Sequence, residues 1–270
     1  ISDEFDLTQL DDPEPRSLLN ETDSLDEMEP ILDDSVTVVI ARPAWTILMD
    51  DQREFYSRQN VRPAIFTLGT AAILANTDMD QEFSDWYQTD VRTESLDDIA
   101  DVAKLFGEHW PMVGIYAGAS LTGRWLEVDP RWASWGDRSL RSMFVGVPPL
   151  LFLQRALGSS RPNDTPPSSD WDFWADDNGA SGHAFVGAVP FLVAAQLAER
   201  PRVQAFWLGL STLTGWSRIN DNDHYLSQVI VGWWLAYAAT NAVERSDQLD
   251  YEIAPALIDN TLGLEATWRR

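Results

Sequence analysis

Two histidines and two arginines lie in three short polar segments of the C-terminal half of this chain. The segments are SSRP at 159–162, ASGHAF at 180–185 and SRINDNDHYLSQ at 217–228. The planar guanidinium groups of Arg161 and Arg218 offer forked donors that match the oxygens of a phosphate. The imidazoles of His183 and His224 titrate near neutral pH, so they can divide the roles of nucleophile and acid between them. The pattern indicates a phosphate-type site with acid–base chemistry.

The segment around His183 adds a second feature of an anion site. Ser181 and Gly182 stand where a helix is expected to begin, and the first N–H groups of a helix have no partner within it. These N–H groups and the positive end of the helix dipole attract an anion, and Gly182 lets the backbone come close to it. Either histidine taken alone is more typical of a structural role. The two histidines together with both arginines favour the phosphate pocket.

His224 is expected to contact Gln228. The two residues are four positions apart and would share one face of a helix. Gly232 and Ala236 continue this face with small side chains, so we expect another helix to pack closely against it.

The three segments resemble the signature motifs of the superfamily that joins type 2 phosphatidic acid phosphatases to vanadium haloperoxidases. The motifs of that superfamily are K-x6-R-P, P-S-G-H and S-R-x5-H-x3-D. This chain has Q-RALGSS-R-P at 154–162, A-S-G-H at 180–183 and S-R-INDND-H-YLS-Q at 217–228. Each motif alone is weak evidence, but the three in order are specific, and the resemblance covers roughly residues 95–245.

The resemblance implies an all-α helical bundle with its phosphate site at helix ends. His224 would be the nucleophile that forms a phosphohistidine, and His183 the acid that protonates the leaving alcohol. Arg161, Arg218 and the backbone of Ser181 and Gly182 would hold the phosphoryl oxygens. In such a family the hydrolysis needs no metal, and vanadate would be a cofactor only in a haloperoxidase.

The chain departs from the family pattern at two charged positions. Gln154 replaces the lysine, and its neighbour Arg155 points about 100° away on a helix, so a simple exchange of roles is not expected. Gln228 replaces the aspartate that orients the nucleophilic histidine. Its carbonyl oxygen can accept the Nδ1–H bond without supplying a negative charge, whereas its NH2 would select the wrong tautomer. Asp221 and Asp223 are candidates for the missing carboxylate. A third change, Ala180 for proline, is minor.

Composition excludes several classes of function. The chain of 270 residues holds 43 acidic and 19 basic residues, a net charge of −24, which disfavours binding to nucleic acids and anionic lipids. It has no cysteine, and its three histidines leave little for a histidine-rich metal centre.

The longest apolar segments, 142–153, 184–197 and 224–239, are typical of buried helices rather than membrane spans. A start without methionine suggests an exported protein, periplasmic or extracellular.

The sequence predicts three regions: an acidic, extended or partly disordered arm at 1–36, a helical domain at 37–245, and a tail at 246–270 with a small hairpin over 251–268. A short strand is expected at 35–41. Expected caps are Ser95, Asp137 and Gly158. Helices are expected at 44–58, 63–76, 83–87, 95–107, 112–127, 137–157, 181–199, 201–216 and 223–243. Pro63 would lie in a first turn, and Pro148 with Pro149 would kink or split a helix.

The segment 158–180 is a long loop, and loops of this length in a compact domain are often functional. Trp171 and Trp174 are candidates for the mouth of a substrate site. Asp176 and Asp177 suggest a solvated turn, and His109, in GEHWP, a structural or exposed side chain.

The sequence thus predicts a metal-independent phosphatase that acts on a phosphomonoester or a lipid (pyro)phosphate. Its partner would be a phosphorylated small molecule or a lipid headgroup. One alternative is a catalytically impaired binding or structural protein of the same fold, suggested by Gln154 and Gln228. A vanadium-dependent haloperoxidase is the third hypothesis, and the missing lysine argues against it.

Overall fold

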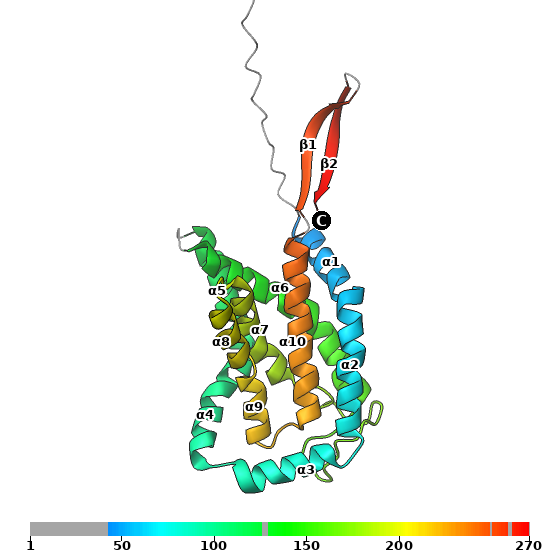
Figure 1. Cartoon of the computed structure of the whole chain (residues 1–270), viewed down its shortest axis with the longest axis vertical. Helices are drawn as coiled ribbons and strands as arrows, with labels where there is room; N and C mark the ends of the chain where they lie inside the picture. The colour runs from blue at the N-terminus through cyan, green and yellow to red at the C-terminus, as the bar shows by residue number, and fades with distance from the viewer. Residues whose placement is uncertain (1–42, 126–128, 249, 259–260, 270) are drawn as a thin grey trace, which may run out of the picture. The chain divides into compact units, whose positions relative to one another are not determined.

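The structure, a computed structural model, describes residues 43–125, 129–248, 250–258 and 261–269 (Figure 1). It confirms the all-α class. The arm at 1–36 and the strand at 35–41 lie outside the described residues and stay predictions. The elements in chain order are α1 (Ala44–Phe55), α2 (Arg58–Ala75), α3 (Met79–Trp86), the π-helix η1 (Tyr87–Val91), α4 (Glu94–Lys104), the 3-10 helix η2 (Leu105–Gly107), α5 (His109–Trp125), α6 (Pro130–Leu157), α7 (Gly182–Leu197), α8 (Pro201–Leu210), α9 (Leu213–Asn220), α10 (Leu226–Asp247), β1 (Asp250–Ile258) and β2 (Thr261–Arg269).

Helices α7 and α10 form the centre of the bundle. Helix α10 contacts α1, α2, α6, α7 and α9, and most side chains of α7 are buried. A helix that is apolar on all sides, as α7 is, must be enclosed by its neighbours. The small residues expected on α10 permit this contact, because a Cβ atom at Gly232 would lie 2.2 Å from the carbonyl oxygen of Ser181. Within the described residues, no helix has the length and apolar character needed to cross a membrane.

Several helices begin earlier than the sequence predicts. Helix α2 starts at Arg58, so Pro63 lies inside it rather than in its first turn. Thr93, not Ser95, caps α4 by accepting the N–H of Leu96. Helix α6 starts at Pro130 behind Asp129, whose side chain accepts the N–H of Arg131, and Asp137 is therefore not a cap. For α4 and α6 a side chain further upstream caps one free N–H group of the first turn, whereas Ser57 before α2 makes no such bond.

Two further boundaries concern helices, and a third concerns the terminal strands. Helix α6 runs through Pro148 and Pro149 without a break and ends at Gly158, which has a positive φ of 64° as predicted for a C-terminal cap. The expected helix over 201–216 is two helices, α8 and α9. Strands β1 and β2 pair antiparallel, with Asp250 opposite Arg269 and Ile258 opposite Thr261, which is the hairpin that the alternating pattern predicts.

A buried ion pair joins α1 to α6 and α10. Arg141 donates from Nε to Asp51 at 2.9 Å and from Nη1 to Asp247 at 2.6 Å, and Asp51 is fully buried. Replacing Asp51 by alanine should lower the free energy of unfolding by about 3 kcal/mol, because Arg141 would keep a buried charge with one partner fewer. Urea denaturation measures this loss. The matched control, Glu199→Gln, breaks the exposed pair with Arg131 and should cost less than about 1 kcal/mol. Equal costs for the two variants would contradict the prediction.

Candidate active site

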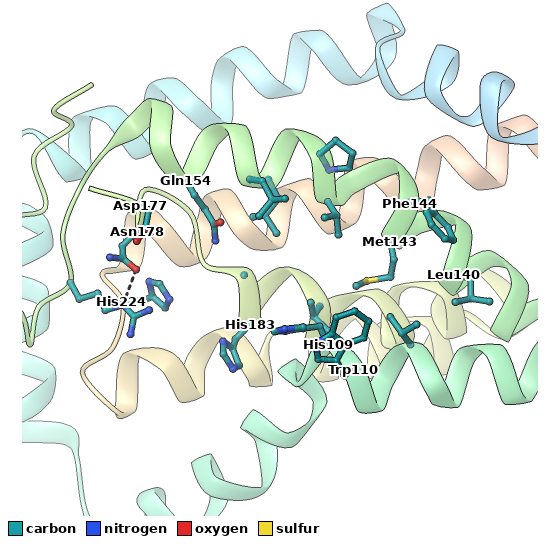
Figure 2. A pocket seen from close by; sticks show the side chains of 18 residues that line it. His109, Trp110, Leu140, Met143, Phe144, Gln154, Asp177, Asn178, His183 and His224 are labelled. Carbon is teal, nitrogen blue, oxygen red and sulfur yellow. Dashed lines mark hydrogen bonds between the residues drawn. The ribbon is translucent and has the colours of Figure 1, made fainter. Parts of the chain in front are cut away.

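A cavity of about 710 Å³ lies between α5, α6 and α7 and is polar at one end and apolar at the other (Figure 2). Residues at the polar end include Gln154, Arg161, Asn178, Gly182, His183 and His224. The apolar end includes Trp110, Leu140, Met143 and Phe144, and Val147 and Leu151 also line the cavity. The structure therefore brings residues of all three motifs to one end of one cavity.

The side-chain amide of Gln228 fixes the tautomer of His224. Its Oε1 accepts the backbone N–H of Tyr225 at 3.1 Å and lies 2.7 Å from Nδ1 of His224. Its Nε2 donates to the carbonyl oxygen of Ser160 at 2.8 Å and to Oγ of Ser159 at 3.0 Å. If the amide were turned over, its NH2 would face the N–H of Tyr225, and its oxygen would face the carbonyl oxygen of Ser160. Neither pair could form a hydrogen bond. The ring therefore donates from Nδ1, and Nε2 of the neutral imidazole carries the free lone pair.

The contact between His224 and Gln228 arises differently from the prediction. His224 lies before α10 rather than on it, and Gln228 is the third residue of that helix, where its side chain caps the N–H of Tyr225. Helix α3 holds this turn in place. Asp80 accepts the N–H of Ser227 at 3.2 Å, and the hydroxyl of Tyr225 donates to the side chain of Gln81 at 2.6 Å.

His183 stands in the first turn of α7, as predicted, but Ser181 acts differently from the prediction. The N–H of Ser181 donates to the carbonyl oxygen of Gln228 at 2.9 Å, so it is not available to a phosphate. Its hydroxyl caps the helix by accepting the N–H of Ala184 at 3.3 Å. By helix geometry the free donors are the N–H groups of Gly182 and His183. The anion cradle is thus shifted one residue along the chain.

The two arginines are held by different partners. Nε of Arg161 donates to Oδ1 of Asn178 at 2.8 Å, and the amide of Asn178 donates to Asp176 at 3.0 Å. Asp176 is therefore part of the support of the site rather than a solvated turn.

Arg218 pairs with Asp221 at 3.2 Å and also with Asp223, so neither carboxylate replaces the aspartate that is missing beside His224. Nε of Arg218 is buried and has no hydrogen-bond partner among the described residues. Arg218 does not line the cavity, although its charge acts on both His183 and His224.

Gln154 lies at the cavity, but it offers no charge. Its Nε2 donates to the carbonyl oxygen of Ala180 at 3.1 Å, and a Cβ atom at Gly182 would lie 3.4 Å from the same nitrogen. Its neighbour Arg155 pairs with Asp177 at 3.3 Å. This agrees with the expectation that Arg155 points in a different direction from Gln154. At the position where the family has a lysine, this site therefore has a neutral hydrogen-bond donor.

Burial and the neighbouring cations lower the pKa of both histidines. Burial lowers the pKa of His224 to about 3, with the charges of Arg161 and Arg218 acting in the same direction. The pKa of His183 is lowered by burial and then by Arg218, while the carboxylate of Glu108 opposes this shift. A neutral His224 is suited to act as a nucleophile, because only the neutral ring has a free lone pair.

Sequence reasoning missed three residues of this site. Asn178, which positions Arg161, lies in a loop without a motif. Glu108 lies 3.7 Å from Nε2 of His183, and His109 lines the cavity. A Cβ atom at Gly107 would lie 2.8 Å from the ring of His183, so this segment rests directly on the imidazole. The short GEH segment before α5 gave no signal of this contact.

Neither tryptophan of the long loop lines the cavity. Trp171 packs against the hydrophobic core, and Trp174 is half-exposed beside Phe152, with their ring centroids 6.3 Å apart. Within the described residues, no group of three or more histidine, aspartate and glutamate side chains could hold a metal ion.

The pKa shifts predict an acidic optimum for any reaction that uses His183 as acid and His224 as nucleophile. The rate would fall below about pH 3, where His224 takes up a proton, and again above the lowered pKa of His183, which lies below 6.5. Glu108→Gln should move the basic limb to lower pH, since it removes the charge that raises the pKa of His183. The pH profile of kcat/KM measures both limbs. The control Glu199→Gln, outside the cavity, should leave them in place, and an unmoved basic limb in Glu108→Gln would contradict the role of Glu108.

The fold and the site together define an all-α protein in which His183, His224 and Arg161 line one cavity, with the charge of Arg218 close to both histidines. Comparison with protein families adds a match to the PAP2 superfamily over residues 141–249, which contain all three motifs. Over these residues the chain is similar to the PAP2 superfamily. No curated protein and no solved structure matches it.

Proposed function

We propose that the protein is a phosphatase of the PAP2 type, which hydrolyses a phosphomonoester or a lipid (pyro)phosphate through a phosphohistidine at His224. The observation that carries this proposal is the fixed orientation of Gln228. It leaves Nε2 of His224 as an unprotonated nitrogen at the end of the cavity that also holds Arg161 and His183. Similarity to the superfamily supports a phosphatase-like or haloperoxidase-like function in general.

In the first step, the phosphoryl oxygens accept hydrogen bonds from Arg161 and the N–H groups of Gly182 and His183, and the nearby charge of Arg218 favours the anion. Nε2 of His224 attacks phosphorus, and the bond from phosphorus to the leaving oxygen breaks. Protonated His183 gives its proton to that oxygen, and the alcohol departs. Nδ1–H of His224 stays bonded to Gln228, which stabilises the ring as it acquires positive charge.

In the second step, neutral His183 takes a proton from a water molecule, which attacks the phosphohistidine. The bond from phosphorus to nitrogen breaks, and the electron pair returns to Nε2 of His224. Phosphate leaves, and His183 is again protonated. Each step uses only side chains and backbone N–H groups of the described site and one water, so the proposal requires no cofactor.

The apolar end of the cavity favours a substrate with an apolar alcohol. A phosphate bound between Arg161 and His183 would direct its ester group toward Met143 and Phe144. An apolar group buried there gains roughly 25 cal/mol for each Å² removed from water. We therefore propose a lipid phosphate or a similar amphiphilic phosphate in preference to a small polar one.

The test is hydrolysis of an aryl phosphate by the purified chain, combined with rapid acid-free quenching to trap the intermediate. Mass spectrometry should find one phosphoryl group on the peptide that contains His224, and the adduct should be stable in base and labile in acid. Turnover without an adduct at His224 would overturn the proposed mechanism.

A binding protein of the same fold is the competing candidate, favoured by the bond of Gln154 to Ala180, which leaves no cation at that position. Calorimetric titration with phosphate, read together with the hydrolysis assay, separates the binding protein from the phosphatase. Binding without any turnover would support the binding protein, and turnover would exclude it.

A further inference from the structure

Six large apolar side chains that line the cavity or belong to α6 and the loop after it are exposed, and we call this set the mouth patch. Each is between 51% and 79% exposed, although burial of such side chains is the rule. The members are Trp110, Phe144, Leu151, Phe152, Phe173 and Trp174.

Three members of the mouth patch belong to the cavity lining. Trp110, Phe144 and Leu151 also line the cavity, so its apolar end opens onto the patch. Phe152 follows Leu151 along α6, and its ring centroid lies 6.3 Å from that of Trp174, which lies 5.0 Å from Phe173. The apolar tail of a ligand bound in the apolar end of the cavity would therefore leave the cavity across the patch.

The charges beside the patch restrict what it can bind. The loop that carries Phe173 and Trp174 also carries Asp170, Asp172 and Asp176, and Arg155 at this edge is already paired with Asp177. Negative charge of this kind repels an anionic membrane surface. Exposed tryptophan and phenylalanine side chains suit the boundary between the headgroups and acyl chains of an uncharged bilayer. Large exposed apolar patches mark interaction sites.

We propose that the mouth patch docks on the surface of a zwitterionic lipid bilayer or micelle, so that the apolar part of a lipid phosphate passes from the lipid into the cavity without crossing water. This inference rests on the proposed function for its substrate, but docking itself requires only the patch. The partner is thus a lipid surface without net charge rather than an acidic one.

The experiment is flotation of the full chain with phosphatidylcholine vesicles, compared with vesicles of phosphatidylglycerol. The wild-type protein should float with the first and much less with the second. Phe152→Ser with Phe173→Ser removes two side chains of the patch that do not line the cavity, and it should reduce flotation at least about tenfold. The control is Phe206→Ser with Leu208→Ser, two exposed apolar residues on α8 away from the cavity lining, which should keep flotation within about twofold of wild type.

A second readout separates docking from catalysis. The patch variant should hydrolyse a soluble aryl phosphate at the wild-type rate but lose activity on phosphatidic acid embedded at a few mole per cent in phosphatidylcholine vesicles. If the wild type hydrolyses neither substrate yet still floats through the patch, the proposed function fails and docking stands.

Three results would overturn the docking proposal. They are no flotation of the wild type on phosphatidylcholine, an equal loss of flotation in the α8 control, or conversion of a dimer to a monomer by the patch variant in sedimentation equilibrium. The last result would assign the patch to contact between two copies of the chain. Thermal melting of both variants confirms that they are folded.

Discussion

His224→Ala should lower kcat/KM for an aryl phosphate by at least about 10⁴-fold, because the substitution removes the nitrogen that attacks phosphorus. The fold should survive the change. Gln228 keeps its bonds to the N–H of Tyr225 and to the carbonyl oxygen of Ser160, so the first turn of α10 remains capped. Steady-state kinetics at the acidic optimum measures the loss, and circular dichroism checks the fold.

His109→Ala is the matched control for this variant. His109 lines the same cavity and is exposed, but the proposed mechanism gives it no part in phosphoryl transfer. Its substitution should keep kcat/KM within about tenfold of wild type, since it removes only a contact with the substrate. If His224→Ala also remained within tenfold, the phosphohistidine mechanism would be wrong.

Gln228→Leu should cost about 10³-fold in kcat/KM, although Gln228 touches no substrate. Without the oxygen that accepts from Nδ1, the ring of His224 is free to place its proton on Nε2, which then cannot attack. The inverted tautomer in a serine-protease triad costs about 10⁴-fold, which sets the scale. Single-turnover measurement of phosphoryl transfer tests this directly. A loss confined to KM would contradict the role of Gln228 in orienting the nucleophile.

Gln228→Asp provides the complementary variant. A carboxylate beside Nδ1 would favour the imidazolium and raise the pKa of His224 above its present value of about 3. The neutral ring would then be lost at higher pH, so the acid limb of the kcat/KM profile should move toward neutrality and activity near pH 4 should fall relative to that near pH 6. An acid limb that stayed in place would mean that the aspartate does not reach His224. The natural glutamine thus extends the working range toward acid.

Local sequence was sufficient for several features of the site. Ser181 caps a helix and places His183 in its first turn, because capping depends on residues within a few positions. Gly158 ends α6 with a positive φ for the same kind of reason. The order and spacing of the motifs identified the superfamily, and the contact between His224 and Gln228 followed from their separation, although the geometry is that of a capped turn.

The bonds that decide the chemistry connect residues far apart in the chain. Whether Gln228 offers its oxygen or its NH2 to His224 depends on the carbonyl of Ser160, 68 positions away. Only the fold shows that Glu108 faces His183 and that Asn178 holds Arg161. Asp221 and Asp223, which stood near His224 in sequence, pair with Arg218 instead.

The sequence by itself therefore determined the all-α class, the order of the motifs and the helix start that carries His183. These features depend on periodicity and on capping, which act over a few residues. The tertiary structure alone decided the orientation of the Gln228 amide, the partners of the two arginines and the apolar end of the cavity. Such contacts arise only when helices α5, α6, α7 and α10 pack together, and no short-range pattern encodes which of their side chains will meet.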